Sequence, residues 1–272
     1  MPSVNFYLIF VSMNIDKKLL KITFLGTGTS QGVPMIASNH PVCLSTDTKD
    51  KRLRSSILIS WDDKTVVIDC GPDFRQQMLR ENVQLVNAVL FTHEHSDHTA
   101  GLDDLRPFCY KIGEMPIFLS KITLDSLEQR FQYIFSQENR YPGAPSVQPN
   151  IIEKTPFSLL GLKTTPIQVL HGNLPILGYR IQNIAYLTDV KTIPIEEKKK
   201  LINLDILIVN ALRIEAHPTH FNLQEALDFI EEIQPKRAYF THISHKLGFH
   251  EEVSRKLPKN VFLAFDGLKI DA

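Results

Sequence analysis

Short hydrophobic runs separated by polar turns dominate the first half of the chain and predict a series of β-strands. The predicted strands cover Leu20–Leu25, Ser56–Ser60, Thr65–Asp69 and Val86–Thr92. Asp62 and Asp63 lie between two of these runs and predict a hairpin turn, because aspartate tolerates turn conformations. We therefore expect a β-sheet in this half of the chain.

Two segments of the same half have helical character. Phe74–Glu81 predicts a helix with Asp73 as its N-cap. Apolar side chains recur at helical spacing between residues 121 and 137, at Leu124, Leu127, Phe131 and Ile134. This spacing predicts an amphipathic helix whose apolar face packs against the core or an interface.

The second half of the chain repeats the alternation of strands and helices. Strands are predicted over Leu162–Leu170, Gly178–Gln182, Ile184–Leu187, Ile206–Val209, Ala238–Thr241 and Val261–Ala264. Helices are predicted over 222–232 and 249–257. Two β-rich halves that both carry helices predict two facing sheets with helices outside, a four-layer α/β sandwich of the αββα type. No linker divides the halves, so we expect one domain over residues 13–272.

Composition and charge narrow the range of possible functions and partners. The chain has 272 residues, 43% of them hydrophobic, and its 30 basic residues balance 30 acidic ones. A chain without net positive charge has no general field for a phosphate backbone, so a nucleic-acid partner is not expected. One basic run, Lys49–Arg54, lies near a glycine-rich loop where it could meet an anion. A second run, 198–200, is expected to be solvated surface.

Cysteine content and the N-terminal segment bear on the cellular compartment. Cys43, Cys70 and Cys109 form no disulfide framework, which suits a reducing compartment. The apolar segment Phe6–Val11 is too short to span a bilayer and lacks the features of a signal peptide. Met13 offers a more conventional start, so we expect residues 1–12 to be an N-terminal extension and the protein to be cytoplasmic, without a membrane partner.

The densest group of metal-capable side chains is His93-Glu94-His95-Ser96-Asp97-His98, an H-x-H-x-D-H motif. It directly follows a predicted strand. His93 and His95 alternate along an extended chain, so both imidazoles can point the same way. Asp97 and His98 come after the strand, where a turn can direct them to a second point. The motif therefore predicts ligands for two adjacent metal ions.

Further ligands are expected at the ends of later strands. His171, Asp189 and His242 each follow an apolar strand directly, as His93 does. A carboxylate such as Asp189 can bridge two cations, and paired metals suit hydrolysis at phosphorus or at a carbonyl. Imidazole and carboxylate ligands are compatible with zinc and with manganese or iron. We expect two divalent metal ions, zinc or manganese.

These motifs resemble the metallo-β-lactamase superfamily over nearly the whole chain from Lys21 onward. The opening segment 25–34, Leu-Gly-Thr-Gly-Thr-Ser-Gln-Gly-Val-Pro, and the closing Thr241-His242-Ile243-Ser244-His245 narrow the resemblance. They are similar to the phosphoribosyl 1,2-cyclic phosphate phosphodiesterase branch. The αββα sandwich of that family is the architecture that the strand and helix pattern also predicts.

The resemblance implies a role for each candidate site residue. The first metal would be held by His93, His95 and His171, and the second by Asp97, His98 and His242, with Asp189 bridging. Asp69 matches a strand-end aspartate that orients the imidazoles. His220 matches a histidine implicated as a general acid and phosphate contact, so it and Asp97 are the expected catalytic residues. His217 and His250 match no such role and are expected at the surface.

The same branch carries a separate structural zinc, bound by three cysteines and a late histidine. Ser38 and His40 stand where two of those cysteines are expected, while Cys43 and His245 remain. His40, Cys43 and His245 could still form a site with three protein ligands. Loss of thiolates weakens such a site, so loop 30–50 could instead be held by packing and hydrogen bonds alone.

The function that these features predict is a dinuclear metal-dependent hydrolase. We expect a phosphodiesterase that acts on a small cyclic phosphate ester through a metal-bound hydroxide. A transfer-RNA 3′-end endonuclease shares the same ligands but typically has a protruding basic arm, which the sequence lacks. Thioester or lactone hydrolysis, a non-catalytic metal-binding domain and a homodimer are left open by the sequence.

Overall fold

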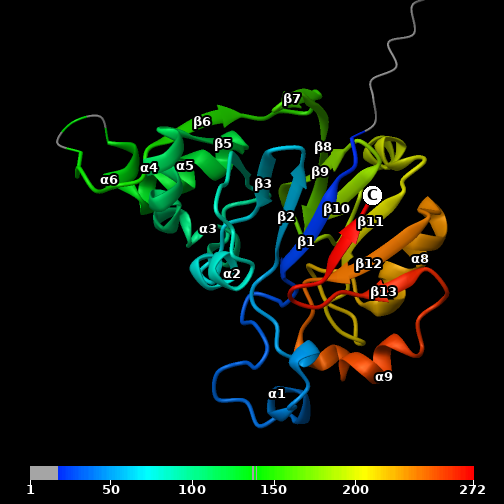
Figure 1. Cartoon of the computed structure of the whole chain (residues 1–272). Coiled ribbons are helices and arrows are strands. Elements are labelled where there is room, and N and C mark those ends of the chain that lie inside the picture. Colours follow the sequence, from blue (N-terminus) through cyan, green and yellow to red (C-terminus); the bar gives the residue numbers. More distant parts are fainter. Residues whose placement is uncertain (1–17, 137, 139) are drawn as a thin grey trace, which may run out of the picture.

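The computed structural model describes residues 18–136, 138 and 140–272. Two seven-stranded sheets face each other, and helices cover their outer surfaces (Figure 1). The strand order is β14-β1-β2-β3-β4-β5-β6 in the first sheet and β13-β12-β11-β10-β9-β8-β7 in the second. The chain therefore forms the predicted four-layer αββα sandwich. The predicted N-terminal extension, residues 1–12, lies outside the described residues.

The first sheet contains most of the first half of the chain together with the C-terminal strand. Its strands are β1 (Lys21–Gly26), β2 (Ser56–Trp61), β3 (Lys64–Ile68), β4 (Ala88–Leu90), β5 (Met115–Leu119), β6 (Val147–Ile151) and β14 (Lys269–Asp271). Strands β1 to β3 are antiparallel neighbours, whereas β3 to β6 run parallel to one another. The parallel part places the ends of β3 and β4 at the same edge of the sheet.

The second sheet repeats this design. Its strands are β7 (Phe157–Leu159), β8 (Leu162–His171), β9 (Leu174–Ile181), β10 (Ile184–Leu187), β11 (Ile206–Asn210), β12 (Arg237–Thr241) and β13 (Val261–Leu263). Strands β7 to β10 are antiparallel, and β10 to β13 are parallel. The carboxyl ends of β10, β11 and β12 therefore also lie along one edge.

The helices, apart from the first, which lies in the loop between β1 and β2, follow strands of the parallel parts of the sheets and pack on the outer faces. They are α1 (Pro41–Leu44), α2 (Phe74–Arg80), α3 (Ser96–Thr99), α4 (Arg106–Ile112), α5 (Lys121–Arg130), α6 (Gln132–Phe135), α7 (Ile195–Lys198), α8 (Leu223–Ile233) and α9 (His250–Ser254). Short 3-10 turns are η1 (Thr48–Asp50), η2 (Leu102–Leu105), η3 (Lys199–Leu201) and η4 (His245–Leu247). Among the described residues, no helix is long and apolar enough to cross a membrane.

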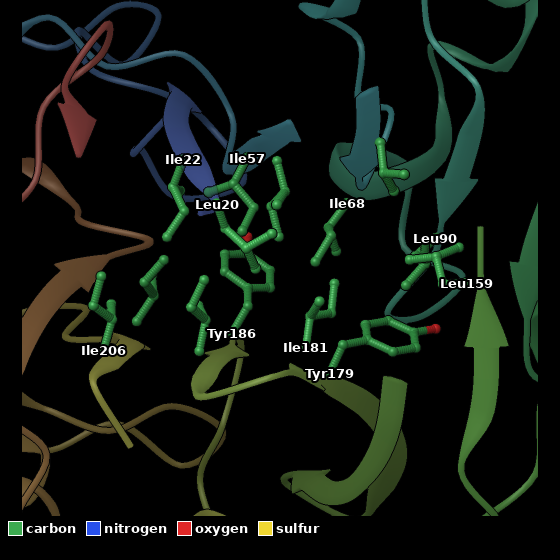
Figure 2. Packing of buried hydrophobic residues seen from close by; sticks show 14 of the residues in the cluster. Leu20, Ile22, Ile57, Ile68, Leu90, Leu159, Tyr179, Ile181, Tyr186 and Ile206 are labelled. Atoms are coloured by element: carbon green, nitrogen blue, oxygen red, sulfur yellow. The ribbon is translucent and has the colours of Figure 1, made fainter. Parts of the chain in front are cut away.

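Three apolar layers hold the sandwich together. The layer between the sheets joins side chains of the first sheet, such as Ile22 and Ile57, to Tyr179, Ile181 and Tyr186 of the second (Figure 2). The other two layers join each sheet to its own helices. Removing this apolar surface from water is the main favourable contribution to folding. Both sheets are thereby fixed relative to one another, together with the edge that carries the predicted metal ligands.

The structure corrects several details of the sequence prediction. The helix predicted over 121–137 divides into α5 and α6 at Phe131, whose φ of −123° and ψ of 44° are not helical. Asp73 stands at the N-cap of α2, but its side chain makes no capping hydrogen bond. It pairs with Arg54 at 3.1 Å instead, so the ion pair competes successfully for this carboxylate.

The expectation of a surface His250 is wrong. Its side chain is buried, and Nδ1 lies 3.2 Å from a guanidinium nitrogen of Arg52. Arg52 is itself buried and donates to Thr27 and to the carbonyl of Ala264. Arg54 is engaged by Asp73, so these two arginines of the basic run 49–54 serve internal contacts rather than an anion. Buried polar groups need such partners because desolvation is costly.

Candidate metal centre

The H-x-H-x-D-H loop follows β4 and is held by the turn after β3. The amide of Cys70 donates to the carbonyl of His98 at 2.8 Å, and the amide of Gly101 donates to the carbonyl of Cys70 at 2.9 Å. A Cβ on Gly71 would lie only 2.1 Å from the carbonyl oxygen of Asp97. Glycine is therefore required at position 71, because the backbone of the metal-ligand loop approaches it so closely.

Three site residues share an unusual backbone conformation at strand ends. Asp69 follows β3, Asp189 follows β10 and His242 follows β12, with φ values of 67°, 57° and 53°. Such left-handed conformations cost free energy in residues other than glycine and cluster at functional sites. Each one turns its side chain out of the strand direction. In this way strands of both sheets contribute to one site.

One predicted set of ligands converges at the edge of the sandwich. Ligand atoms of Asp97, His98, Asp189 and His242 all lie within 4.8 Å of one another. Nε2 of His98 is 3.0 Å from a carboxylate oxygen of Asp97 and 3.3 Å from one of Asp189. Nε2 of His242 is 3.2 Å from the other oxygen of Asp189. The structure therefore brings the residues expected at the second metal together.

The chemistry of this group fits a cation. Nδ1 of His98 is 2.7 Å from Asp69, which accepts its proton, so a neutral His98 presents a lone pair at Nε2. That lone pair faces the carboxylates of Asp97 and Asp189, and Nε2 has no hydrogen-bond partner among the described residues. When His98 is neutral, electron-rich atoms thus converge here without a donor between them, and the place of the Nε2 proton is open to a cation. A divalent metal ion satisfies this arrangement, because it accepts electron pairs from imidazole and carboxylate together.

The second predicted set is formed by His93, His95 and His171. Nε2 of His93 and Nδ1 of His95 are 3.0 Å apart, and the ring of His171 lies 5.2 Å from that of His95, centroid to centroid. The remaining nitrogens of two of these rings have partners: Nδ1 of His93 contacts the hydroxyl of Thr92, and Nδ1 of His171 contacts the carbonyl of Thr219. Their Nε2 atoms are thereby left to act as ligands.

Asp189 connects the two sets. Besides its contacts with His98 and His242, the carboxylate of Asp189 lies within 4.8 Å of ligand atoms of His171 and His220. Nε2 of His220 lies 3.0 Å from Oδ1 of Asp189, and its ring is 4.5 Å from that of His171. Oδ1 of Asp189 therefore faces both His220 and His242, whereas Oδ2 faces His98, and the bridging position stays a prediction. His220 lies beside this carboxylate.

Burial and charge act in opposite directions on the titration of these groups. Burial raises the pKa of Asp189, but His242 and His98 together lower it by more, so that it lies well below its usual range. Burial also disfavours charge on His98, yet Asp97, Asp189 and Asp69 raise its pKa well above the usual value. Burial lowers the pKa of His220 to about 4 against the opposing effect of Asp189. Both metal-facing carboxylates are thus charged near neutral pH.

The glycine-rich segment after β1 runs beside this centre. The amide of Thr29 donates to the carbonyl of Ile243, and the amide of Ile243 donates to the carbonyl of Thr27, at 3.0 and 2.9 Å. The segment thereby holds the backbone next to His242. Gly28 is required here, because a Cβ would lie 2.8 Å from the carbonyl oxygen of Arg52.

The possible structural zinc ligands do not form a comparable group. The rings of His40 and His245 lie 4.9 Å apart, but among the described residues the converging groups of metal-capable side chains do not include His40, Cys43 and His245 together. Nδ1 of His40 instead accepts the amide of Val42 at the start of α1. Loop 30–50 is also held by Asp50, which accepts the amide of His250.

Two threonines that position the histidines were missed by sequence reasoning. Thr92 donates its hydroxyl and its amide to Asp69 and contacts Nδ1 of His93. Thr219 contacts His171 through its carbonyl and His220 through its hydroxyl. Both threonines are direct sequence neighbours of a predicted site histidine, which is the one signal that the sequence offers.

Comparisons with known proteins agree with this geometry. A family model described as a beta-lactamase superfamily domain matches residues 64–243. The crystal structure of a diphosphatase from the PhnP family is 40% identical, with a TM-score of 0.88, over 93% of this chain and 97% of that one. Zn²⁺-bound PqqB from Methylobacterium extorquens shares the fold at 20% identity, with a TM-score of 0.74 over 93% of this chain and 100% of that one.

A longer relative is the octanoyltransferase of Porphyromonas gingivalis, which is 40% identical over 257 residues. The match covers 92% of this chain but 51% of that protein, so the chain spans about half the length of this curated relative. Coenzyme PQQ synthesis protein B of Xanthomonas axonopodis is 31% identical, over 58% of this chain and 54% of that protein. The family match and the near-complete structural match at 40% identity decide the assignment. The chain belongs to the metallo-β-lactamase superfamily of hydrolases and, within it, to the PhnP-family branch.

Proposed function

We propose that the chain is a phosphodiesterase that hydrolyses a small cyclic phosphate ester with the help of two divalent metal ions. The observation that carries this proposal is the carboxylate of Asp189, which lies between two groups of metal-capable side chains. Two metals joined by such a bridge suit in-line displacement at phosphorus, where charge develops on both the attacking and the departing oxygen. The similar structure named as a diphosphatase supports chemistry at phosphorus.

The metals would be held by His93, His95 and His171 on one side and by Asp97, His98 and His242 on the other, with Asp189 between them. When bound, they would activate water and neutralise charge on the phosphate. Zinc and manganese both fit these ligands. The low pKa of Asp97 makes it a poor proton acceptor, so its proposed catalytic part is to orient the attacking water by accepting a hydrogen bond.

His220 is the proposed proton donor. The attacking water loses one proton to the solvent, and its oxygen forms a new bond to phosphorus while the bond from phosphorus to the leaving oxygen breaks. His220 gives its proton to that leaving oxygen, and is reprotonated from solvent afterwards. Burial lowers the pKa of His220, and a bound anionic phosphate would raise it again. The position of His220 beside Asp189, at 3.0 Å, supports this part because a phosphate between the metals would lie next to its Nε2.

A small substrate is favoured over a transfer RNA. The chain has zero formal charge, which does not attract a long phosphate backbone. In sequence, relatives named ribonuclease Z match over 32% of the chain. The solved structure of human tRNase Z, at 20% identity, shares the fold alone. The name octanoyltransferase belongs to a protein about twice as long as the matching segment, so it gives no direct reason to assign acyl transfer to this chain.

A panel of substrates with the metal-loaded protein tests the proposal. The panel contains a five-membered cyclic phosphate ester, bis(p-nitrophenyl) phosphate, a linear diphosphate, a thioester and a precursor transfer RNA. We expect the cyclic ester to give the highest kcat/KM, and Asp189→Ala to abolish its cleavage. Asp228→Ala, which alters an exposed carboxylate on α8, is the matched control and should keep full activity. Full activity of Asp189→Ala, or a clear preference for the thioester or the RNA, would overturn the proposal.

A further inference from the structure

Two hydrogen bonds from the second sheet reach the backbone just before the H-x-H-x-D-H loop. The hydroxyl of Tyr179 in β9 donates to the carbonyl of Phe91 at 2.6 Å. The amide of Leu177, two positions earlier in β9, donates to the carbonyl of Thr92 at 2.9 Å. Phe91 and Thr92 follow β4 of the first sheet, so these two bonds join the sheets directly in front of His93.

These two bonds supply a direction that the apolar layer between the sheets does not. Burial of apolar surface is compatible with many relative positions of two sheets, because the hydrophobic effect is not directional. A hydrogen bond, in contrast, requires a narrow range of distance and angle. The rigid ring of Tyr179 is buried in the layer between the sheets (Figure 2). Its hydroxyl therefore keeps the carbonyl of Phe91 at a defined distance from β9.

The two bonds act on one half of the metal centre. The carbonyl of Thr92 shares a peptide plane with the amide of His93, so a bond to this carbonyl restricts the orientation of the first predicted ligand. His171 ends β8, and β8 pairs along its length with β9, which carries both donors. The rings of His93 and His171 lie 5.8 Å apart, centroid to centroid. The placement of His93 relative to His171 therefore depends on the bonds between the sheets.

The other half of the metal centre is held by different contacts. The ring of His98 is held by Asp69. Ile243, the neighbour of His242, is held by backbone hydrogen bonds to the glycine-rich segment after β1. Neither of these contacts involves β9. Loss of a bond from β9 should therefore act on the ligand set of His93 before it acts on that of His98.

We propose that Tyr179 is a positioning residue, which sets the distance between His93 and His171 and so the affinity of the metal ion that they would hold. Its hydroxyl acts through the backbone of Phe91 and not by binding the ion itself. The inference rests on the two-metal function proposed above and extends it to a residue of the layer between the sheets.

The adjacent strand offers a matched control. Tyr186 of β10 is the register partner of Tyr179, and both side chains are 1% exposed in the layer between the sheets (Figure 2). The hydroxyl of Tyr186 has no hydrogen-bond partner among the described residues. Replacing either tyrosine by phenylalanine removes one buried hydroxyl. Tyr179→Phe also deprives the buried carbonyl of Phe91 of this partner, which carries a desolvation cost.

Stepwise zinc titration of the metal-free protein against a chelator tests the inference without turnover. We expect two binding steps in the wild type. Tyr179→Phe should weaken one step by about 10-fold and the other by about twofold or less, whereas Tyr186→Phe should leave both steps within about twofold of the wild type.

Two backgrounds identify the step that is affected. With His171→Ala, which removes a ligand of the first set, the further change Tyr179→Phe should cost nothing more at the remaining site. With His242→Ala, which removes a ligand of the second set, Tyr179→Phe should keep its full effect.

A variant that restores a donor separates positioning from general destabilisation. In Tyr179→4-aminophenylalanine the amine can donate to the carbonyl of Phe91 from the place of the lost hydroxyl. This variant should recover most of the zinc affinity that Tyr179→Phe loses. Melting temperatures of the metal-free proteins measure the loss of stability separately.

Several results would overturn the inference. They are equal weakening of both steps, no weakening, an equal effect of Tyr186→Phe, and no recovery with 4-aminophenylalanine. A wild type that binds a single zinc ion would overturn it together with the two-metal function. Two intact binding steps that do not respond to Tyr179→Phe would contradict the positioning role alone.

Discussion

The carboxylate of Asp69 lies 2.7 Å from Nδ1 of His98, and both side chains are fully buried. The same carboxylate accepts the amide and the hydroxyl of Thr92, which in turn contacts Nδ1 of His93. One aspartate therefore sets the orientation of a ring in each of the two predicted ligand sets. Because Asp69 fixes which ring nitrogen of each histidine carries a proton, it also determines which nitrogen is left to bind a metal ion.

Replacing Asp69 by Asn should weaken metal binding by about 10- to 100-fold. The Asn oxygen can still accept from Thr92, but the amide NH₂ then faces Nδ1 of His98. His98 would have to accept there and carry its proton on Nε2, which removes the lone pair that faces Asp97 and Asp189. Competition titration against a chelator measures the change. Wild-type affinity in this variant would contradict the assigned role, and Asp228→Asn on exposed α8 is the control.

Removing the metals should lower the melting temperature by several degrees. Asp97 and Asp189 hold negative charge at the buried end of the site, and a cation that binds only the folded chain stabilises it by mass action. At a free metal concentration 100 times Kd the gain is about 2.7 kcal/mol per site. Thermal melts with chelator and with added zinc or manganese measure the shift. The metal-dependent shift in melting temperature should vanish in Asp189→Ala. A shift of equal size in that variant would show that the stabilising ion binds elsewhere.

Gly71→Ala should abolish activity and destabilise the fold by about 2 kcal/mol or more. The new Cβ would meet the carbonyl oxygen of Asp97 at 2.1 Å, so the loop with Asp97 and His98 must move. Urea unfolding and metal content measure the two effects. Gly161→Asn serves as a comparison for backbone strain alone, because a Cβ there meets no atom within 4 Å but its φ of 92° is strained for residues other than glycine. Normal metal content in Gly71→Ala would show that the loop tolerates displacement.

Acid should destabilise the fold in part through His250. Burial, with Arg52 next in effect, lowers the pKa of His250 to about 4 in the folded chain, whereas the unfolded chain protonates near the ordinary value of about 6.5. Between these values the unfolded state binds more protons, so stability falls as pH falls from about 6.5 towards 4. His250→Asn keeps an acceptor for Arg52 without titrating. Between pH 7 and pH 5 the free energy of unfolding of this variant should fall less than that of the wild type, by a difference on the order of 1 kcal/mol.

Denaturant melts of both proteins at the two pH values give this difference directly. Groups remote from the imidazole affect both proteins alike, so the difference between the two pH responses reports on His250. An identical pH response of the wild type and the variant would show that His250 is not a source of acid sensitivity.

Strand prediction from the sequence succeeded where hydrophobic runs were uninterrupted. The strand predicted over Ile184–Leu187 coincides with β10, and the runs behind β2 and β12 differ from the observed strands by one residue. Strands β5 and β6 were missed, because Pro116 and Pro149 interrupt their runs and proline disfavours a strand. Strand β14 is short, and its pairing with β1 depends on the distant start of the chain.

The convergence of the metal-capable side chains was predictable for a similar reason. Its histidines and aspartates stand directly after apolar strands, and parallel strands bring such positions to one edge. The supporting contacts were not predictable, because threonine at positions 92 and 219 has no motif of its own. The burial of His250 was missed because it depends on Arg52, which is 198 positions away in the chain.

The division of the ligands between the two sheets has a consequence for synthesis of the protein. The H-x-H-x-D-H loop follows β4 of the first sheet, whereas His171, Asp189 and His242 stand at the ends of strands in the second. During translation the growing chain displays four potential ligands after residue 98, but the last of the set is not made until residue 242. The complete set of proposed metal ligands therefore exists only after residue 242 has been made, when every strand of the two sheets except β13 and β14 has already been synthesised.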